Sequence, residues 1–338
     1  MKIEKRHYCN IEKPYAIQLI HWQGEEYCVA ASENRDGDTV LIHTASGMVH
    51  NILGLNGGVM SIIEEEEGVL LAIERFYPIF QSKKARIVRF TLPQSGNPSL
   101  PKVEPVADLP YVHRILTLQF QNQKNIIAGT LCTNKEFEQD WSSPGTIYIL
   151  PCNADTPQSS LPLSIHKHHG MWHYNKNGTI LVSGTEGIYE IGQTGEEWTA
   201  KRWLVNEVSD MCLFDLDGDS VDEMVTIEKF HGDELCFYRQ NNGEWQKFYT
   251  EPVAFCHAIW AGKIGGVPCV LGANRGDEKE LLLFVCNFGP NNQFSLTRYV
   301  VDTAVGTTNF AVRQQGKDTT VFASNHGSAE IASYSLHL

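Results

Sequence analysis

Residues 270–284, VLGANRGDEKELLLF, contain the pattern that decides the fold. An apolar strand ends in small residues, a turn with an arginine beside a glycine follows, and a second apolar strand completes the unit. Residues 321–334, VFASNHGSAEIASY, have the same form with a histidine at the turn. Short apolar runs bounded by Gly, Asn and Asp, without helical periodicity, predict an all-β protein.

The unit occurs seven times, at a spacing of about 40 to 55 residues, which is the spacing of four-stranded propeller blades. The other copies, some of them degenerate, are at 29–44, 70–90, 125–137, 180–191 and 225–238. The C-terminal copy stops after its third strand, at AEIASYSLHL, while the N-terminal KIEKRHYCNIEKP offers a further strand. We therefore predict one domain over residues 1–338, a seven-bladed β-propeller closed by the N-terminal strand joining the C-terminal blade. The rival interpretation, two all-β sandwiches, explains neither the period nor the incomplete last copy.

Composition excludes several function classes. The net charge of −13 and the pI near 5.4 argue against nucleic acid or an anionic membrane as partner. The N-terminus lacks the apolar core of a secretory signal, and no segment approaches the roughly 18 apolar residues that span a bilayer. The nine cysteines form no CxxC pair, which favours buried reduced thiols. We expect a soluble, cytoplasmic protein.

The acidic stretch DLDGDSVDE (215–223) predicts a calcium loop. Its carboxylates alternate along a tight turn around Gly218, and a hard cation takes six to eight oxygen ligands. The predicted ligands are Asp215, Asp217, Asp219, Asp222 and Glu223. The stretch resembles the calcium loop of FG-GAP or VCBS repeats, the units of integrin-alpha-type propellers, in which it joins the first two strands of a blade. A solvated acidic turn without metal is the alternative. A single such loop indicates local stabilisation of one blade.

Three blades place a histidine where their first strand begins, in YVHRIL, KHHGMW and FCHAIW, and a fourth has Asp210 there. These are His113, His169 and His257. Because the first strands of all blades surround the ring axis, we expect the three imidazoles to converge there. Three neutral imidazoles are a usual ligand set for zinc or manganese with open coordination positions. The alternative is that each histidine only hydrogen-bonds to backbone at the crowded centre.

The turns between the second and third strands lie at the same end of the ring as these histidines, opposite the acidic loop. They carry the candidate catalytic residues Arg35, Arg75, His231, Arg275 and His326. Arginine suits bidentate binding of a carboxylate or phosphate, and histidine can move a proton.

The stretches FCHAIWAGKIGGVPCVLGANRGDEKELLLF and VVDTAVGTTNFAVRQQGKDTTVFASNHGSAEIASY resemble the propeller repeats of aldos-2-ulose dehydratase-like proteins. The resemblance is clearest over residues 205–338. It implies elimination of water from a keto-sugar, with a metal on His113, His169 and His257 and with His231 or His326 as base. The sequence thus predicts a metal-dependent lyase, dehydratase or isomerase acting on a small keto-sugar or uronate, whose carboxylates the arginines would hold. The alternative is a non-catalytic propeller that binds a protein or glycan.

Overall fold

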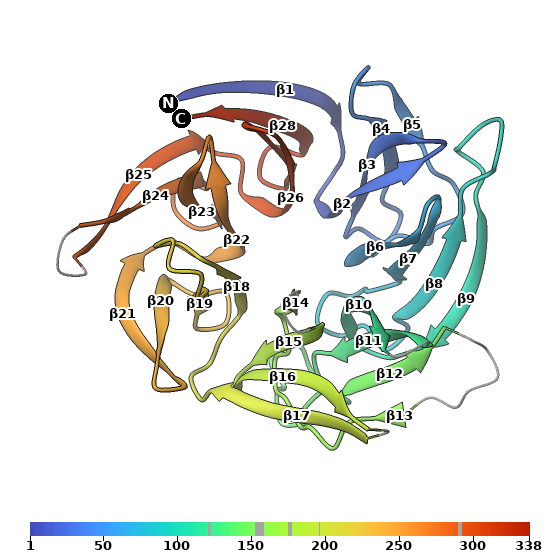
Figure 1. Cartoon of the computed structure of the whole chain (residues 1–338). Helices are drawn as coiled ribbons and strands as arrows, with labels where there is room; N and C mark the ends of the chain where they lie inside the picture. The colour runs from blue at the N-terminus through green and yellow to red at the C-terminus, as the bar shows by residue number, and fades with distance from the viewer. Residues whose placement is uncertain (121–122, 153–158, 175–177, 196, 290–292) are drawn as a thin grey trace.

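The computed structural model describes the whole chain except residues 121–122, 153–158, 175–177, 196 and 290–292. Its strands form seven antiparallel sheets of four strands each, arranged as a ring (Figure 1). This is the seven-bladed β-propeller that the repeats predict.

Each blade has its first strand near the ring axis and its last strand at the rim (Figure 1). The first three blades are β2 (Pro14–Trp22), β3 (Glu25–Ser32), β4 (Thr39–His43), β5 (Val49–Asn51); β6 (Ser61–Glu66), β7 (Val69–Glu74), β8 (Arg86–Thr91), β9 (Lys102–Asp108); and β10 (Val112–Phe120), β11 (Gln123–Thr130), β12 (Ile147–Pro151), β13 (Ser159–Ser160). The next three are β14 (Met171–Tyr174), β15 (Thr179–Gly184), β16 (Gly187–Thr194), β17 (Glu197–Leu204); β18 (Asp210–Phe214), β19 (Glu223–Glu228), β20 (Glu234–Asn241), β21 (Glu244–Pro252); and β22 (Cys256–Ile264), β23 (Val267–Asn274), β24 (Leu281–Phe288), β25 (Phe294–Asp302). The seventh blade has β26 (Thr307–Gln315), β27 (Asp318–Asn325) and β28 (Glu330–His337), with β1 (Lys2–Asn10) as its outer strand.

The N-terminal strand closes the ring, as the incomplete last copy of the repeat predicts. β1 pairs antiparallel with β28, from Lys2 opposite His337 to Asn10 opposite Glu330, and the two ends of the chain lie side by side (Figure 1). The Lys5 ammonium strengthens the closure with ion pairs to Glu330 at 2.7 Å and Asp302 at 2.8 Å. Without β1, the outer edge of β28 would be unpaired and open to association with strands of other molecules.

The core consists of apolar layers between neighbouring blades. Leu71 of the second blade and Ile126 of the third belong to one such layer, and Val225 and Val270 to another. The second strand of each blade has a neighbouring blade on both faces. Accordingly, the four consecutive residues 70–73 of β7, LLAI, are all buried, so that this strand is apolar on both sides instead of alternating.

The strand register shows which residues lie at the same end of a blade. In the fifth blade Asp210 pairs with Ile227, and Phe214 pairs with Glu223 at the other end. The acidic loop follows Phe214 and therefore lies on one face of the ring, which we call the lower face. The turn after β19, with His231, lies on the upper face.

All nine cysteines are free thiols, as predicted, and those on the strands next to the axis are buried. No helix long and apolar enough to cross a membrane occurs in the described part of the chain.

Candidate functional site

Four blades use the same irregularity to direct a side chain towards the ring axis. The pairing of the first strand with the second skips one residue in each of them, so that this residue has no partner across the sheet. The skipped residues are Tyr15, His113, His257 and Thr308. A bulge of this kind bends the strand and re-aims the side chain of the extra residue. The bulges explain how distant repeats bring polar groups together at one point.

Two further histidines reach the axis from loops. His169 precedes β14, and its N–H donates a hydrogen bond to the Ser183 carbonyl. His231 is on the turn after β19 with a φ of 49°, the left-handed region that a non-glycine residue rarely adopts. This backbone conformation directs the His231 ring towards the axis.

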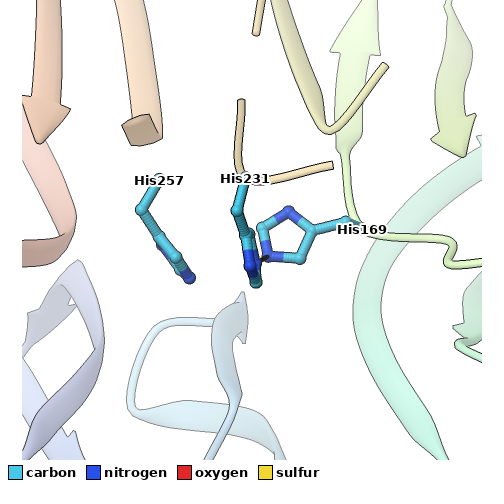
Figure 2. Close-up of side chains that lie close together, drawn as sticks. All are labelled: His169, His231 and His257. Carbon is cyan, nitrogen blue, oxygen red and sulfur yellow. Dashed lines mark hydrogen bonds between the residues drawn. The ribbon is translucent and has the colours of Figure 1, made fainter. Parts of the chain in front are cut away.

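The rings of His169, His231 and His257 meet over the upper end of the axis, and Figure 2 shows His231 between the other two. One nitrogen of each ring lies within 4.8 Å of the others. The Nε2 atoms of His169 and His231 are 3.2 Å apart. Two nitrogen ligands on one tetrahedral zinc ion would be about 3.3 Å apart, given zinc–nitrogen distances of about 2.0–2.1 Å. We call this group, with His113 beside it, the histidine centre.

His113 lies next to this triad and not within it. Its ring centroid is 4.9 Å from that of His169. The Tyr15 hydroxyl lies 3.4 Å from His113 Nε2 and 3.3 Å from His257 Nε2, and so connects the two imidazoles. The histidines predicted as metal ligands are therefore in contact, but His231, predicted as a base, completes the closest set of nitrogens.

Burial keeps these imidazoles neutral. His113, His169 and His257 are each only 1% exposed. Loss of hydration, followed by the positive charge of neighbouring groups, holds all three pKa values well below 6.5. The same causes, burial first and then Arg275, lower the pKa of His231 to about 3. A neutral imidazole has the lone pair that metal coordination requires.

The tautomer of His257 follows from its neighbour. The Thr308 carbonyl oxygen is 2.6 Å from His257 Nδ1, so Nδ1 must carry the proton and donate it to that oxygen. In the neutral ring Nε2 then has the lone pair, which faces the Tyr15 hydroxyl at 3.3 Å. Backbone carbonyls orient many metal-binding histidines in this way.

A cavity of about 310 Å³ continues along the axis below the histidine centre. Its walls include Arg114 and Asp210 from neighbouring inner strands. The Arg114 guanidinium donates a hydrogen bond to the His169 carbonyl oxygen at 2.8 Å. Burial raises the pKa of Asp210 to about 6, and the charge of Arg114 opposes this shift. Arg114 and Asp210 therefore bring opposite charges to the wall below the histidine centre.

The other upper-face residues predicted from the sequence are dispersed. Arg35 lies over the Tyr77 ring at 5.4 Å, Arg75 is 3.6 Å from a Glu74 carboxylate oxygen, and Arg275 lies over the Phe255 ring at 5.6 Å. His326 Nε2 donates to Glu33 at 2.9 Å. Of this set, only His231 has ring contacts with the other histidines of the centre in the described part of the chain.

The acidic loop joins β18 to β19, as predicted. One oxygen each from Asp215, Asp217 and Asp219 lies within 4.8 Å of the others. Of the other two predicted ligands, Asp222 is outside this group, and Glu223 is buried and accepts a hydrogen bond from the Leu216 N–H. Burial, with the charges of the neighbouring aspartates, raises the pKa of Glu223 to about 7.

The sequence prediction did not include Tyr15 and Thr308, although a signal for Tyr15 was present. The stretch YAI at 15–17 aligns with HAI at 257–259, each at the start of an inner strand. A search for histidine alone passes over the other polar residues at this position.

His168, next to His169, has unusual surroundings. It is fully buried, and neither ring nitrogen has a hydrogen-bond partner among the described residues. A Cβ atom at Gly129 would lie 2.2 Å from the His168 Cε1 atom, so glycine makes room for the ring. Burial lowers the pKa of His168 to about 3.

No protein-family model matches the sequence, and no curated protein matches it. Among solved structures, the β-propeller domain of Myceliophteria thermophila Cps50 (Swd1) is similar, with a TM-score of 0.63 and 10% identity over 98% of this chain and all (100%) of that chain. The S. cerevisiae core factor is similar with a TM-score of 0.57 and 12% identity, over 99% of this chain and 60% of that one. At such low identity these likenesses show the β-propeller fold alone.

Proposed function

We propose that this propeller is a metal-dependent lyase acting on a carbohydrate with a carboxylate group, of the uronate type. The observation that supports it most strongly is the meeting of three imidazole nitrogens, from His169, His231 and His257, within 4.8 Å of one another. The resemblance to FG-GAP or VCBS propellers and to sugar lyases agrees with this proposal and stays a prediction.

The donor set fits a divalent transition metal such as zinc or manganese. All three rings are neutral, and the hydrogen bond from His257 Nδ1 to Thr308 orients one of them with its lone pair inward. His231 then serves as a ligand, in place of the role as base that the sequence predicts for it. A bound metal would act as a Lewis acid towards the substrate.

Two arginines and two carboxylates, Asp210 and Glu33, act on the histidine centre by their charge. Arg114 and Arg275 are close enough to lower the pKa of His257 by their charge. A divalent ion on three neutral ligands would make the net charge at the centre positive. A carboxylate would offset it, whereas a neutral keto-sugar would not. This favours the uronate over the keto-sugar among the predicted substrates.

The residues of the centre provide the remaining chemistry. β-Elimination removes the proton α to the carboxylate and breaks the carbon–oxygen bond at the β position, which leaves a carbon–carbon double bond. His113 is neutral, outside the triad, and its Nδ1 has no hydrogen-bond partner among the described residues. We assign it the role of base, and the Tyr15 hydroxyl, whose pKa burial raises to about 12, the role of proton donor to the departing oxygen.

Calcium at the acidic loop is a separate part of the proposal. The carboxylates of Asp215, Asp217 and Asp219 lie on the lower face, away from the histidine centre, so that a calcium ion there would stabilise the fifth blade without contacting substrate.

A non-catalytic propeller that binds a protein or glycan is the second candidate. The burial of His113, His169 and His257, each 1% exposed, favours it, because a substrate must reach a catalytic centre. Both similar solved structures share only the fold with this chain, and propellers serve many functions.

Metal analysis separates these candidates. Purified protein should contain about one equivalent of zinc or manganese, and His231→Ala should lose it while keeping the circular dichroism spectrum of the wild type. His326→Ala is the matched control, since His326 is on the equivalent turn of the seventh blade and pairs with Glu33. Formation of an unsaturated uronate, followed by absorbance, then tests the reaction. Wild-type protein without transition metal would exclude the lyase as proposed.

A further inference from the structure

A second cavity, of about 440 Å³, lies on the upper face of the ring. We call it the basic pocket, and four of its lining residues are cations: Arg35, Lys83, Lys84 and Lys135. Among the described residues that line it, Glu136 is the only one with a carboxylate. The chain as a whole carries a net charge of −13, so a local excess of positive charge is not expected from the composition. Its volume is in the range of small-ligand sites, about 300–1,000 Å³.

The cations of the basic pocket are not held in direct ion pairs. Within the described part of the chain, none of the four cations has a carboxylate oxygen within 4.0 Å. Arg35, Lys83 and Lys84 are exposed and free to reach a ligand. By contrast, Arg86 and Lys167 are paired with Glu74 and Glu207. Unpaired cations that line one cavity form a binding site for anions.

Lys135 is the most unusual of the four, because it is only 2% exposed. Its ammonium lies 3.2 Å from the centroid of the Trp141 ring and donates to the Glu138 carbonyl oxygen at 2.6 Å. The carboxylates of Asp140 and Glu138 act on this ammonium from beyond ion-pair distance. Burying a charge without a direct ion pair is costly, and a ring face offsets only part of that cost. An anion in the pocket would supply a direct ion pair to this ammonium.

Aromatic rings connect the basic pocket to the histidine centre. Trp141, beside Lys135, lies 5.7 Å from Phe80 and 5.9 Å from Phe230, measured between ring centroids. Phe230 in turn stacks on His231 at 4.0 Å. The two sites are therefore connected by a chain of contacting rings, of which Trp141 and Phe230 are partly exposed. A ligand that covers these two rings would extend from one site to the other.

Resting on the proposed function, we propose that the basic pocket is a second substrate subsite, so that the substrate is an oligosaccharide of acidic sugars and not a single sugar. One carboxylate lies at the histidine centre, and a carboxylate further along the same oligosaccharide lies between Arg35, Lys83, Lys84 and Lys135. The apolar faces of the intervening sugar rings stack on Trp141 and Phe230.

The combination of groups selects this ligand class. An acidic oligosaccharide has both a repeated negative charge and apolar ring faces, which match the cations of the basic pocket and the neighbouring aromatic rings. An acidic peptide offers the charge without the ring faces. A long nucleic acid would meet the net negative charge of the whole protein beyond the pocket.

Calorimetric titration of the full-length, metal-containing protein tests the subsite. The probes are tetragalacturonate, its methyl ester, which has the same skeleton without charge, and a tetraglutamate peptide. We expect tetragalacturonate to bind at least tenfold more tightly than either of the others. Lys83→Ala combined with Lys84→Ala should weaken its binding by about tenfold, the order expected for two exposed charge contacts. The matched control is Lys201→Ala with Lys317→Ala, two exposed lysines away from the pocket, which should leave binding unchanged.

The result separates the subsite from the proposed function. Equal binding of the methyl ester, or undiminished binding by the Lys83/Lys84 variant, would overturn the subsite even if the wild type holds its metal. Equal binding of tetraglutamate would overturn the assignment to carbohydrate. Tetragalacturonate binding that depends on both lysines, in protein that contains no transition metal, would support the subsite and refute the lyase.

Discussion

The buried imidazole of His168 should make this protein less stable in acid by an amount that the structure specifies. In the unfolded chain the imidazole has a pKa of 6.5, and in the folded chain burial lowers it to about 3. Between these values the unfolded state binds a proton that the folded state does not, so the free energy of unfolding falls as the pH falls. The contribution of His168 to stability is complete above pH 6.5 and is progressively lost below it.

The magnitude follows from the separation between pH and the unfolded pKa. At pH 5.0, about 1.5 units below 6.5, the loss is about 2 kcal/mol, since one unit corresponds to about 1.4 kcal/mol. Glu223 and Asp210 have raised pKa values, to about 7 and about 6, and their contributions have the opposite sign. The pH dependence of the wild type alone is therefore a sum of opposing effects. Comparison with a variant that lacks only the His168 imidazole isolates one of them.

The assay is urea denaturation of wild type and His168→Leu at pH 7.5 and pH 5.0, after removal of metals with a chelator. From pH 7.5 to pH 5.0, the free energy of unfolding of the variant should rise by about 2 kcal/mol relative to that of the wild type. His168→Asn provides a check, because it packs differently but also lacks the titrating group and should show the same pH-dependent gain. If the stability difference between variant and wild type is the same at both pH values, the folded-state pKa of His168 is not depressed and the reasoning is wrong.

Three further outcomes are expected. Gly129→Ala should destabilise the fold by about 1–3 kcal/mol in urea denaturation, because its Cβ would overlap the His168 ring; adding His168→Ala should recover part of the loss, and purely additive effects would contradict the contact. Calcium at one hundred times its dissociation constant should stabilise the wild type by about 2.7 kcal/mol and should stabilise Asp217→Asn much less. If calcium does not raise the melting temperature of the wild type, the acidic loop does not bind it. Lys247→Met should lower the free energy of unfolding by about 1–3 kcal/mol, because the buried Glu228 carboxylate loses the ammonium that lies 3.0 Å away. An unchanged urea midpoint would show that this ion pair does not stabilise the fold.

The architecture is largely readable from local sequence. The seven-fold repeat predicts the blades, and the incomplete copy at residues 321–338 predicts that β1 completes the last sheet. Both predictions succeed because strand and turn preferences, and the need to bury one apolar layer against the next, act within about 50 residues. The position of the acidic loop between β18 and β19 follows from the same short-range pattern.

The composition of the histidine centre depended on the tertiary structure. The sequence by itself determined that His113, His169 and His257 share one place in the repeat, and that His231 lies on a turn at the same end of the ring. Only the folded ring decided that His231, with its φ of 49°, comes within 3.2 Å of His169, while a bulge directs His113 to Tyr15. Ring closure brings together residues more than one hundred positions apart, and a bulge or a single backbone angle then decides which nitrogens converge. Neither effect leaves a periodic signal in the chain, because each depends on a few dihedral angles and on neighbours from other blades.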